Sequence, residues 1–219
     1  MKTGWRIGLV LSLALLAGFA AGGWYLAHAS LRARSASSPV LPGPVDVGFA
    51  QFMSRHHDQA VVMTQIMQSR GTTRLLGLVR SIQTAQLLEI GQMQGWLRLW
   101  DKPLLPGTRS MDWMLLGKAP PDPALARYLI DCQTAPGGMP GMATSQALNQ
   151  LRALDGEPRD RLFLELMIRH HQGGLPMALF AAHNARVPAV RALAAQMAFH
   201  QSEELGYMTL LLRADQRPK

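Results

Sequence analysis

Cysteine is nearly absent from this chain of 219 residues, which contains Cys132 and no other. A single cysteine excludes a disulfide bond within the chain, and it excludes a metal site built from several thiolates. Because the sequence offers no partner thiol, we interpret Cys132 as a buried, unreactive side chain. Any metal site in this protein must therefore use other donor atoms.

The sequence also lacks the motifs that are typical of common enzyme classes. It contains no Ser/His/Asp arrangement, no glycine-rich phosphate loop and no dinucleotide-binding fingerprint. The Glu-x-x-His motif, which di-iron proteins carry on two helices of a four-helix bundle, occurs nowhere in the chain. These absences argue against a di-iron oxidase, and we expect no enzymatic activity.

Nucleic-acid binding is not expected either, although the formal net charge is +8. The first 34 residues hold four basic side chains and no acidic one, so residues 35–219 hold 18 basic against 14 acidic side chains. No run of basic residues alternates with aromatic residues, and no RNA- or DNA-binding motif is present. We therefore predict that the chain has no nucleic-acid partner.

One long uncharged run is present, from Ile7 to Ala27, and it contains 21 residues. Such a run can cross a bilayer as a helix, and it is longer than the apolar core of an ordinary signal peptide. Ala27 and Ala29 also form a small-x-small triplet that a signal peptidase could cut. We predict that residues 1–29 are a membrane anchor or a signal segment and that residues 30–45, rich in Ser, Pro and Arg, are a flexible linker. In either case the remainder is exported, as a domain anchored in the inner membrane and facing the periplasm or as a free periplasmic one.

The rest of the chain carries two matched stretches twice. The first, Asp-x2-Phe-x3-Met-x2-His-His-x5-Met, begins at Asp46 and again 114 positions later at Asp160. The second, Gln-x2-Glu-x-Gly-x-Met, begins at Gln86 and again 115 positions later at Gln201. A repeat of this kind predicts two copies of one structural unit.

Apolar residues at helical spacing predict four helices in residues 46–213 and almost no strand. The expected ranges are 46–70, with Asp46 as N-cap, 73–100, 160–184, which continues past Pro176, and 188–213. Residues 101–158 are rich in proline, and only 144–155 is expected to be a regular helix there. Two tight hairpins joined by one long crossover predict an all-α, ferritin-like four-helix bundle made of two duplicated hairpins.

The repeat places His, Glu and Met at helical spacing in both halves. Adjacent helical residues differ in direction by about 100°, so we expect His56 and His170 to face inward and the second histidine of each pair to lie at the flank. Glu89 and Glu204 fall on inward faces, where a carboxylate needs a partner, and the inward imidazoles are the expected partners. Each histidine–glutamate pair has two interpretations. It would contribute to a metal site, or it would only give the buried carboxylate a hydrogen-bond partner without any metal. The residues of this constellation are His56, His170, Glu89 and Glu204 on the inward faces, with His57 and His171 at the flank.

The chain contains 13 methionines, which have the same two interpretations. A thioether is a good core filler and also a soft ligand that suits Cu(I). Those of the repeat are at core spacing. Met139 and Met142 lie in a Pro- and Gly-rich loop with little core to fill, so they could form a flexible copper site or cap the bundle. The candidate methionine ligands are Met53, Met63, Met167, Met177, Met139 and Met142.

Four motifs together resemble the domain-of-unknown-function 305 family: Met-x-x-His-His at 53–57, Gly-Met-Pro-Gly-Met at 138–142, Phe-Leu-x-Leu-Met-Ile-x-His-His-Gln-Gly at 163–173 and Gln-x-x-Glu-x-x-x-Met at 201–208. The resemblance covers residues 46–212. It implies a ferritin-like bundle, export from a bacterial cytoplasm and, in some members, periplasmic copper binding through Met and His. Carried over by position, the ligands that the resemblance implies are His56, His57, His170 and His171, with Met53, Met63, Met167 and Met177 beside them. The family pattern usually continues the second His-His pair as Gln-Gly-Ala, whereas this chain has Gln-Gly-Gly-Leu-Pro at 172–176. That difference predicts a looser helix directly after the second pair.

These observations together predict an exported bacterial protein that binds copper through His and Met without catalytic turnover. One alternative is a membrane-anchored helical interaction module that holds no metal. Another is a ferritin-like oxidoreductase, for which the required motif is missing. The expected partners are a metal ion and, through the N-terminal segment, a membrane.

Overall fold

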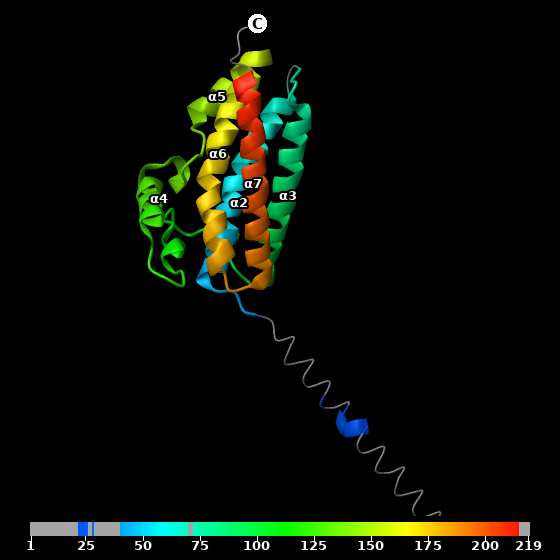
Figure 1. Cartoon of the computed structure of the whole chain (residues 1–219), viewed down its shortest axis with the longest axis vertical. Coiled ribbons are helices and arrows are strands. Elements are labelled where there is room, and N and C mark those ends of the chain that lie inside the picture. The colour runs from blue at the N-terminus through cyan, green and yellow to red at the C-terminus, as the bar shows by residue number, and fades with distance from the viewer. Residues whose placement is uncertain (1–21, 26–27, 29–39, 70–71, 215–219) are drawn as a thin grey trace, which may run out of the picture. The chain divides into compact units, whose positions relative to one another are not determined.

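The computed structural model of the chain describes residues 22–25, 28, 40–69 and 72–214 (Figure 1). The chain forms two compact units, Met1–Val40 and Leu41–Lys219. In the first unit residues 22–25 and 28 are helical, and the ring centroids of Trp24 and His28 lie 4.5 Å apart. In the described part of the chain, no helix combines the length and the hydropathy that a membrane span requires. Most of the predicted anchor, 1–29, and linker, 30–45, lies outside the described residues, so both remain predictions.

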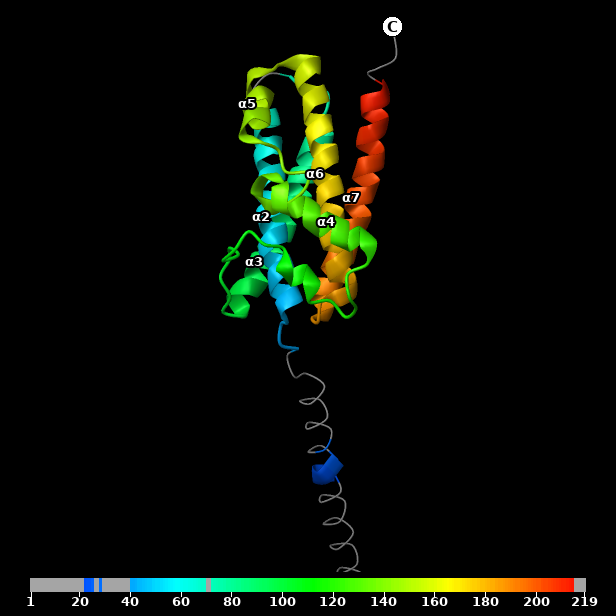
Figure 2. The same ribbon diagram turned by 90° about the vertical axis from the view of Figure 1, so that its left-hand side faces the viewer.

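The second unit is built on four long helices: α2 (Pro44–Ser69), α3 (Leu76–Leu99), α6 (Gly156–Asn184) and α7 (Pro188–Ala214). Their ends agree with the predicted ranges to within four residues. Helices α2 and α3 form one hairpin, α6 and α7 form the other, and the hairpins join where α2 packs against α6 (Figures 1 and 2). No strand occurs among the described residues. The prediction of an all-α bundle is confirmed.

The crossover between the hairpins contains η1 (Asp112–Leu115), α4 (Pro123–Thr134), η2 (Pro136–Gly138) and α5 (Ser145–Ala153). It lies along one side of the bundle (Figure 1). The prediction that 144–155 is the one regular helix of this segment was wrong, because α4 is also regular. Pro123 begins α4 at a position where a missing N–H costs nothing, and the Asp122 carboxylate accepts a hydrogen bond from the Leu125 N–H. Proline here starts a helix instead of ending one.

The core of the second unit consists of two apolar clusters stacked along the bundle. The basal cluster, toward the end where α2 begins, includes Phe49, Met53 and Trp113. The apical cluster, toward the opposite end, includes Met63 and Phe163. Along α2 and α6, the histidine pairs of the repeat fall between residues of the basal cluster and residues of the apical cluster.

An aspartate clamps the bundle at each end. Asp46 does not act as the predicted N-cap: it lies inside the first turn of α2, and its carboxylate accepts hydrogen bonds from the N–H groups of Gly43, Arg186 and Val187 at 2.8, 3.1 and 2.8 Å. Its repeat partner Asp160 binds the turn of the first hairpin, at the Thr73 hydroxyl (2.7 Å) and the Arg74 N–H (3.3 Å). The first residue of each repeat thus fixes the turn of the other hairpin.

We expect the Asp46→Ala substitution to lower the free energy of unfolding by about 3 kcal/mol, because it leaves backbone N–H groups without an acceptor. The measurement is urea denaturation followed by circular dichroism. The control is Asp131→Ala, which removes an exposed ion pair with Arg127 and should cost no more than about 0.5 kcal/mol. Equal losses in the two variants would show that Asp46 is not a clamp.

Candidate metal centre

Four imidazoles lie between the basal and apical clusters and are here called the histidine layer: His56 and His57 on α2, and His170 and His171 on α6. Each is 0 to 1% exposed. The expectation that His57 and His171 lie at the flank was wrong, since these two are also fully buried. In a bundle of four helices the buried arc of a central helix exceeds 100°, so two adjacent residues can both face the interior in different directions.

The first histidine of each pair faces the other hairpin. The rings of His56 and His170 stack across the α2–α6 contact, with centroids 3.7 Å apart and planes inclined by 33°. His170 Nε2 lies 2.9 Å from the His56 carbonyl oxygen, which can accept a hydrogen bond only from a protonated nitrogen. This bond gives His170 the Nε2–H tautomer and leaves its Nδ1 as a lone-pair donor.

The second histidine of each pair faces the other helix of its own hairpin, and it holds the buried glutamate there. His57 Nε2 lies 2.8 Å from Glu89 Oε2, and His171 Nε2 lies 2.6 Å from Glu204 Oε2. We had expected the glutamates to pair with His56 and His170, and that assignment was wrong by one residue in each half. The carboxylates fix Nε2–H tautomers on His57 and His171.

The bonds to carboxylate and carbonyl leave a set of imidazole nitrogens without partners. Nδ1 of all four histidines, and also Nε2 of His56, are buried and make no hydrogen bond of full geometry, although a backbone contact with His170 raises the pKa of the His56 ring against the effect of burial. Nearly all buried polar atoms in proteins are hydrogen-bonded, so five such atoms in one layer require an explanation. An unpaired nitrogen whose ring donates its other N–H to a carboxylate or a carbonyl is the arrangement that metal-binding histidines adopt.

The two stacked rings are uncharged at neutral pH. Burial lowers the pKa of His56 well below 6.5, and the neighbouring imidazoles, His170 first among them, lower this pKa further. Burial likewise lowers the pKa of His170, with His171 as the strongest neighbouring influence. Neutral imidazole is the form that binds metal ions.

Thioethers flank the histidine layer on both sides. Met53 and Met177 belong to the basal cluster, and Met63 and Met167 belong to the apical cluster. This division follows from the repeat, because two antiparallel copies place the first methionine of one beside the last methionine of the other. All four side chains are 0% exposed. They fill the core, and they are also the soft donors nearest to the layer in sequence.

The loop methionines do not form a flexible site on the surface. Met139 is 0% exposed in the basal cluster, and Met142 packs against that cluster. The loop is fixed to α2 by Gln59, whose side chain donates to the Ala143 carbonyl at 2.9 Å and accepts from the Ala143 N–H at 2.6 Å. Gln59 was not among the predicted residues, and only its place three residues after His56 could have suggested it.

The Gly-Gly step after His171 has a packing role. The loop passes so close to Gly173 that a Cβ there would overlap the Pro140 carbonyl. A Cβ on Gly174 would lie 2.9 Å from Cε1 of His56 and 3.1 Å from Oε1 of Gln201. The helix continues unbroken through both glycines and past Pro176. The glycines therefore admit the loop and the His56 ring.

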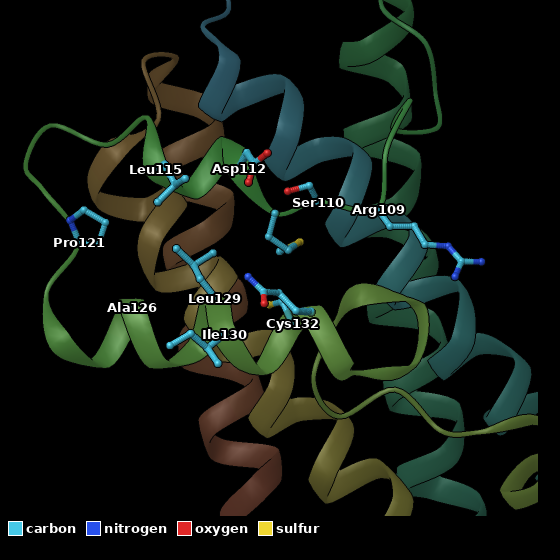
Figure 3. Close-up of a pocket in the computed structure, with 11 residues that line it drawn as sticks. Arg109, Ser110, Asp112, Leu115, Pro121, Ala126, Leu129, Ile130 and Cys132 are labelled. Carbon is cyan, nitrogen blue, oxygen red and sulfur yellow. The ribbon is translucent and has the colours of Figure 1, made fainter.

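A separate cavity of 360 Å³ lies between η1 and α4 and contains none of the predicted ligands (Figure 3). Its lining includes Met111, Leu129 and Cys132, and the side chain of Arg109 points away from it (Figure 3). Cys132 is buried, as predicted, and burial raises the pKa of its thiol to about 11. Cys132 is therefore a protonated thiol and a poor metal ligand.

The donor chemistry of the histidine layer fits a soft or borderline metal ion, with one geometric condition. Within the part of the chain that the structure describes, no three His, Cys, Asp or Glu side chains converge on a point that could hold an ion. An ion bound in the layer would thus need donors of another type to complete its coordination, and the flanking thioethers are of that type.

The model of the DUF305 family, a domain of unknown function, matches residues 46–212. This chain belongs to the DUF305 family. Two solved DUF305 structures support the assignment: a presumed secreted protein from Streptomyces coelicolor, 33% identical with a TM-score of 0.66, and a fragment from Deinococcus radiodurans, 32% identical with a TM-score of 0.59. The first alignment covers 78% of this chain and 93% of the other, and the second covers 79% and 98%.

CopM in its Cu(I)-bound form has the same fold as this DUF305 protein. The two chains are 22% identical with a TM-score of 0.56, over 78% of this chain and 98% of CopM. CopM has also been solved in Cu(II)-bound and Ag-bound forms. No curated protein sequence matches the chain.

We expect Gly174→Ala to lower the free energy of unfolding by about 1–3 kcal/mol, because the added methyl group meets the His56 ring. The controls are Gly91→Ala and Gly206→Ala. These two helical positions correspond to each other in the repeat, and a Cβ at either of them would meet nothing within 4 Å. Each control should stabilise the protein by about 0.5–1 kcal/mol. The three variants would be compared by urea denaturation, and a gain in stability for Gly174→Ala would contradict the packing role.

The pKa shifts predict a loss of stability in mild acid. The pKa values of His56 and His170 are lowered in the folded DUF305 domain, so the unfolded chain binds more protons below its own histidine pKa of about 6.5. The free energy of unfolding therefore does not depend on these two groups above that pH. Below it the free energy of unfolding falls by up to about 1.4 kcal/mol per pH unit for each extra proton that the unfolded chain binds. Unfolding free energies at pH 7.5, 6 and 5 measure the slope.

The controls for the pH effect are His183→Gln and His200→Gln, because these two histidines are exposed. Both should retain the wild-type slope, whereas a His56→Gln/His170→Gln variant should lose most of it. A slope that persists unchanged in the double variant would assign it to other groups.

Proposed function

We propose that this DUF305 protein binds copper for tolerance or handling, without catalytic turnover, and that it holds the ion in the histidine layer. The observation that carries the proposal is the set of five buried imidazole nitrogens without partners. In three of the four rings the opposite nitrogen is fixed by Glu89, Glu204 or the His56 carbonyl. Bonds of this kind orient a histidine and raise its basicity toward a metal.

The choice of copper rests on the donor types around the layer. Thioether sulfur and imidazole nitrogen together favour Cu(I), whereas a site for magnesium or calcium would be made of oxygen donors. The ligands proposed for this chain are the four histidines with Met53, Met63, Met167 and Met177, while Glu89 and Glu204 act through the imidazoles. Met139, which belongs to the basal cluster, and Met142, which packs against it, are proposed as further thioether donors.

The comparisons support this proposal at the level of the fold. CopM holds Cu(I), Cu(II) and Ag in solved forms. Silver(I) is a soft ion like Cu(I), so these structures show that a bundle of this architecture can accommodate ions of that kind.

The glutamates give the buried layer its contact with solvent. The side chains of Glu89 and Glu204 are 11% and 21% exposed, whereas His57 and His171 beneath them are 0% exposed. An ion that approaches from water on either hairpin therefore meets a carboxylate before it meets an imidazole. Negative charge at this position favours the approach of a cation.

We also propose that the protein is exported and that residues 1–29 anchor it in the inner membrane or are cleaved after export. The uncharged run from Ile7 to Ala27 and the presumed secretion of the Streptomyces coelicolor relative support this proposal. A fractionation experiment that compares the mass of the mature protein with that of the full chain would distinguish the anchored form from the cleaved form.

A helical module without metal is the second candidate, and one observation favours it. The described side chains do not converge on a ready three-ligand site of His, Cys, Asp or Glu. In that case the His57–Glu89 and His171–Glu204 pairs would serve only to satisfy the core.

The deciding experiment is an anaerobic titration of the purified chain with Cu(I) against a competing chelator. We expect stoichiometric copper that the chelator does not remove, and an affinity lowered about 10- to 100-fold in a His56→Gln/His170→Gln variant. A Met139→Leu/Met142→Leu variant measures the share of the loop while preserving side-chain volume.

The control for the titration is a His183→Gln/His200→Gln variant, which changes the same number of histidines on the surface. It should bind copper as the wild type does. Urea denaturation of each variant without metal shows whether a loss of binding reflects a loss of folding. Absence of competitive binding in the wild type would sink the proposal in favour of the module without metal.

A further inference from the structure

The end of the bundle at which α2 begins carries a second feature of this molecule, here called the basal surface. It consists of exposed side chains from the start of the second unit, the end of α3, the loop that follows and the α6–α7 turn: Leu41, Arg98, Leu99, Lys102, Leu105, Leu116, Lys118 and Arg186. Figures 1 and 2 show these segments at the same end.

Hydrogen bonds hold the segments of the basal surface together. The Gln51 side chain of α2 donates to the carbonyls of Pro103 and Leu105 at 2.7 and 3.4 Å. The Lys118 N–H donates to the Asn184 side chain at 2.9 Å, at the end of α6. Asp46 accepts from the Arg186 N–H in the turn that follows. The loop is thus attached to both hairpins and forms a defined surface.

The basal surface is unusually apolar for an exposed loop region. Leu99 is 81% exposed, Leu105 66% and Leu116 56%, and Leu41 beside them is 67% exposed. Trp96 and Trp100, half-buried under this region, stack with ring centroids 6.1 Å apart. Large apolar side chains gathered on one end of a domain mark an interaction site, and leucine with neighbouring tryptophan is typical of surfaces that meet the boundary of a bilayer.

The charge of the basal surface is positive. Among the exposed residues at 98–105 and 116–118, three are basic (Arg98, Lys102 and Lys118) and one is acidic (Asp101). Arg186 adds a further exposed basic residue at the α6–α7 turn. Basic side chains interspersed with leucine complement the negative charge of anionic lipid head groups.

The length of sequence before the second unit limits how far the start of α2 could lie from a membrane that held the uncharged run. The uncharged run ends at Ala27, and α2 begins at Pro44, so 16 residues connect them. A chain of that length spans at most about 55 Å when fully extended. If the run lies in a bilayer, the basal surface stays within this reach of the lipid head groups.

We propose that the basal surface binds the surface of an anionic lipid bilayer, with its leucines in the interfacial region and its basic side chains on the lipid phosphates. This binding is separate from the proposed copper site, because it uses no residue of the histidine layer. The proposed membrane anchoring would keep the domain close to lipid, but the binding itself does not require it. Its test is therefore made without metal.

The test is hydrogen–deuterium exchange of the full chain with vesicles of phosphatidylcholine alone and with vesicles that also contain phosphatidylglycerol. We expect the amides of residues 98–118 to exchange more slowly with the anionic vesicles than with the neutral ones. Flotation of the same samples reports separately whether the chain associates with lipid at all. Equal exchange of residues 98–118 in the two vesicle types would overturn the proposal, even where the chain floats with both.

Paired variants assign the effect to the basal surface. Arg98→Glu/Lys102→Glu should reduce the protection of residues 98–118 about tenfold, because each basic residue near an anionic surface contributes to binding. Arg80→Glu/Arg213→Glu changes the net charge equally with exposed residues near the apical end and should leave that protection unchanged. Leu99→Ser/Leu105→Ser should likewise reduce it, whereas Leu88→Ser/Leu210→Ser, each 64% exposed, should not.

Two results would reject the proposed lipid surface. One is equal loss of protection in both charge variants, which would show a general effect of net charge. The other is protection that appears on the outer faces of α3 and α7 instead, which would indicate contact with a second copy of the chain. The unfolding midpoints of all four variants should match the wild type, since every substituted side chain is exposed.

Discussion

The contact of α2 with α6 through two stacked imidazoles is the constraint on which the rest of this bundle depends. It joins hairpins that otherwise pack mainly within themselves, and its rings are 3.7 Å apart in a place without solvent. A charge on either ring would be isolated from water, so the rings must stay neutral and water must stay out. The basal and apical clusters exclude water on the two sides, and the aspartate clamps keep the hairpins in register at the two ends.

The crossover explains why a duplicated sequence yields two unlike halves. Positions 59 and 173 are equivalent in the repeat, yet one is Gln59 and the other Gly173. The single loop at 139–143 contacts both: Gln59 binds the backbone of Ala143, and Gly173 leaves room for the Pro140 carbonyl. The Tyr128 hydroxyl adds a hydrogen bond to the Gly173 carbonyl at 2.9 Å. One loop cannot be symmetric about the axis that relates the hairpins, so the two positions it touches must differ.

Much of the fold follows from the sequence, because a constant offset of 114 residues fixes two copies of one helix and apolar spacing fixes its length. The placement of the site follows less completely. Helical spacing alone showed that His56 and His57 point about 100° apart, but only packing shows that both directions are interior, one toward α6 and the other toward Glu89 on α3. Helix α4 was missed because Pro123 was read as a breaker. The role of Asp46 across the hairpins depends on tertiary contacts that no local pattern encodes.

The surroundings of the two stacked histidines differ by one methyl group at an equivalent position of the repeat. The His56 ring lies against Gly174, where a Cβ would come within 2.9 Å of its Cε1 atom. Ala60 occupies the equivalent position in the first half and carries that Cβ. The His170 ring donates to the His56 carbonyl on α2, whereas the His56 ring has a backbone contact with His170 that falls short of a full hydrogen bond. The duplication thus produces one unsymmetrical set of donor atoms in place of two equivalent sites. His56 is the histidine of this set with neither ring nitrogen in a full hydrogen bond.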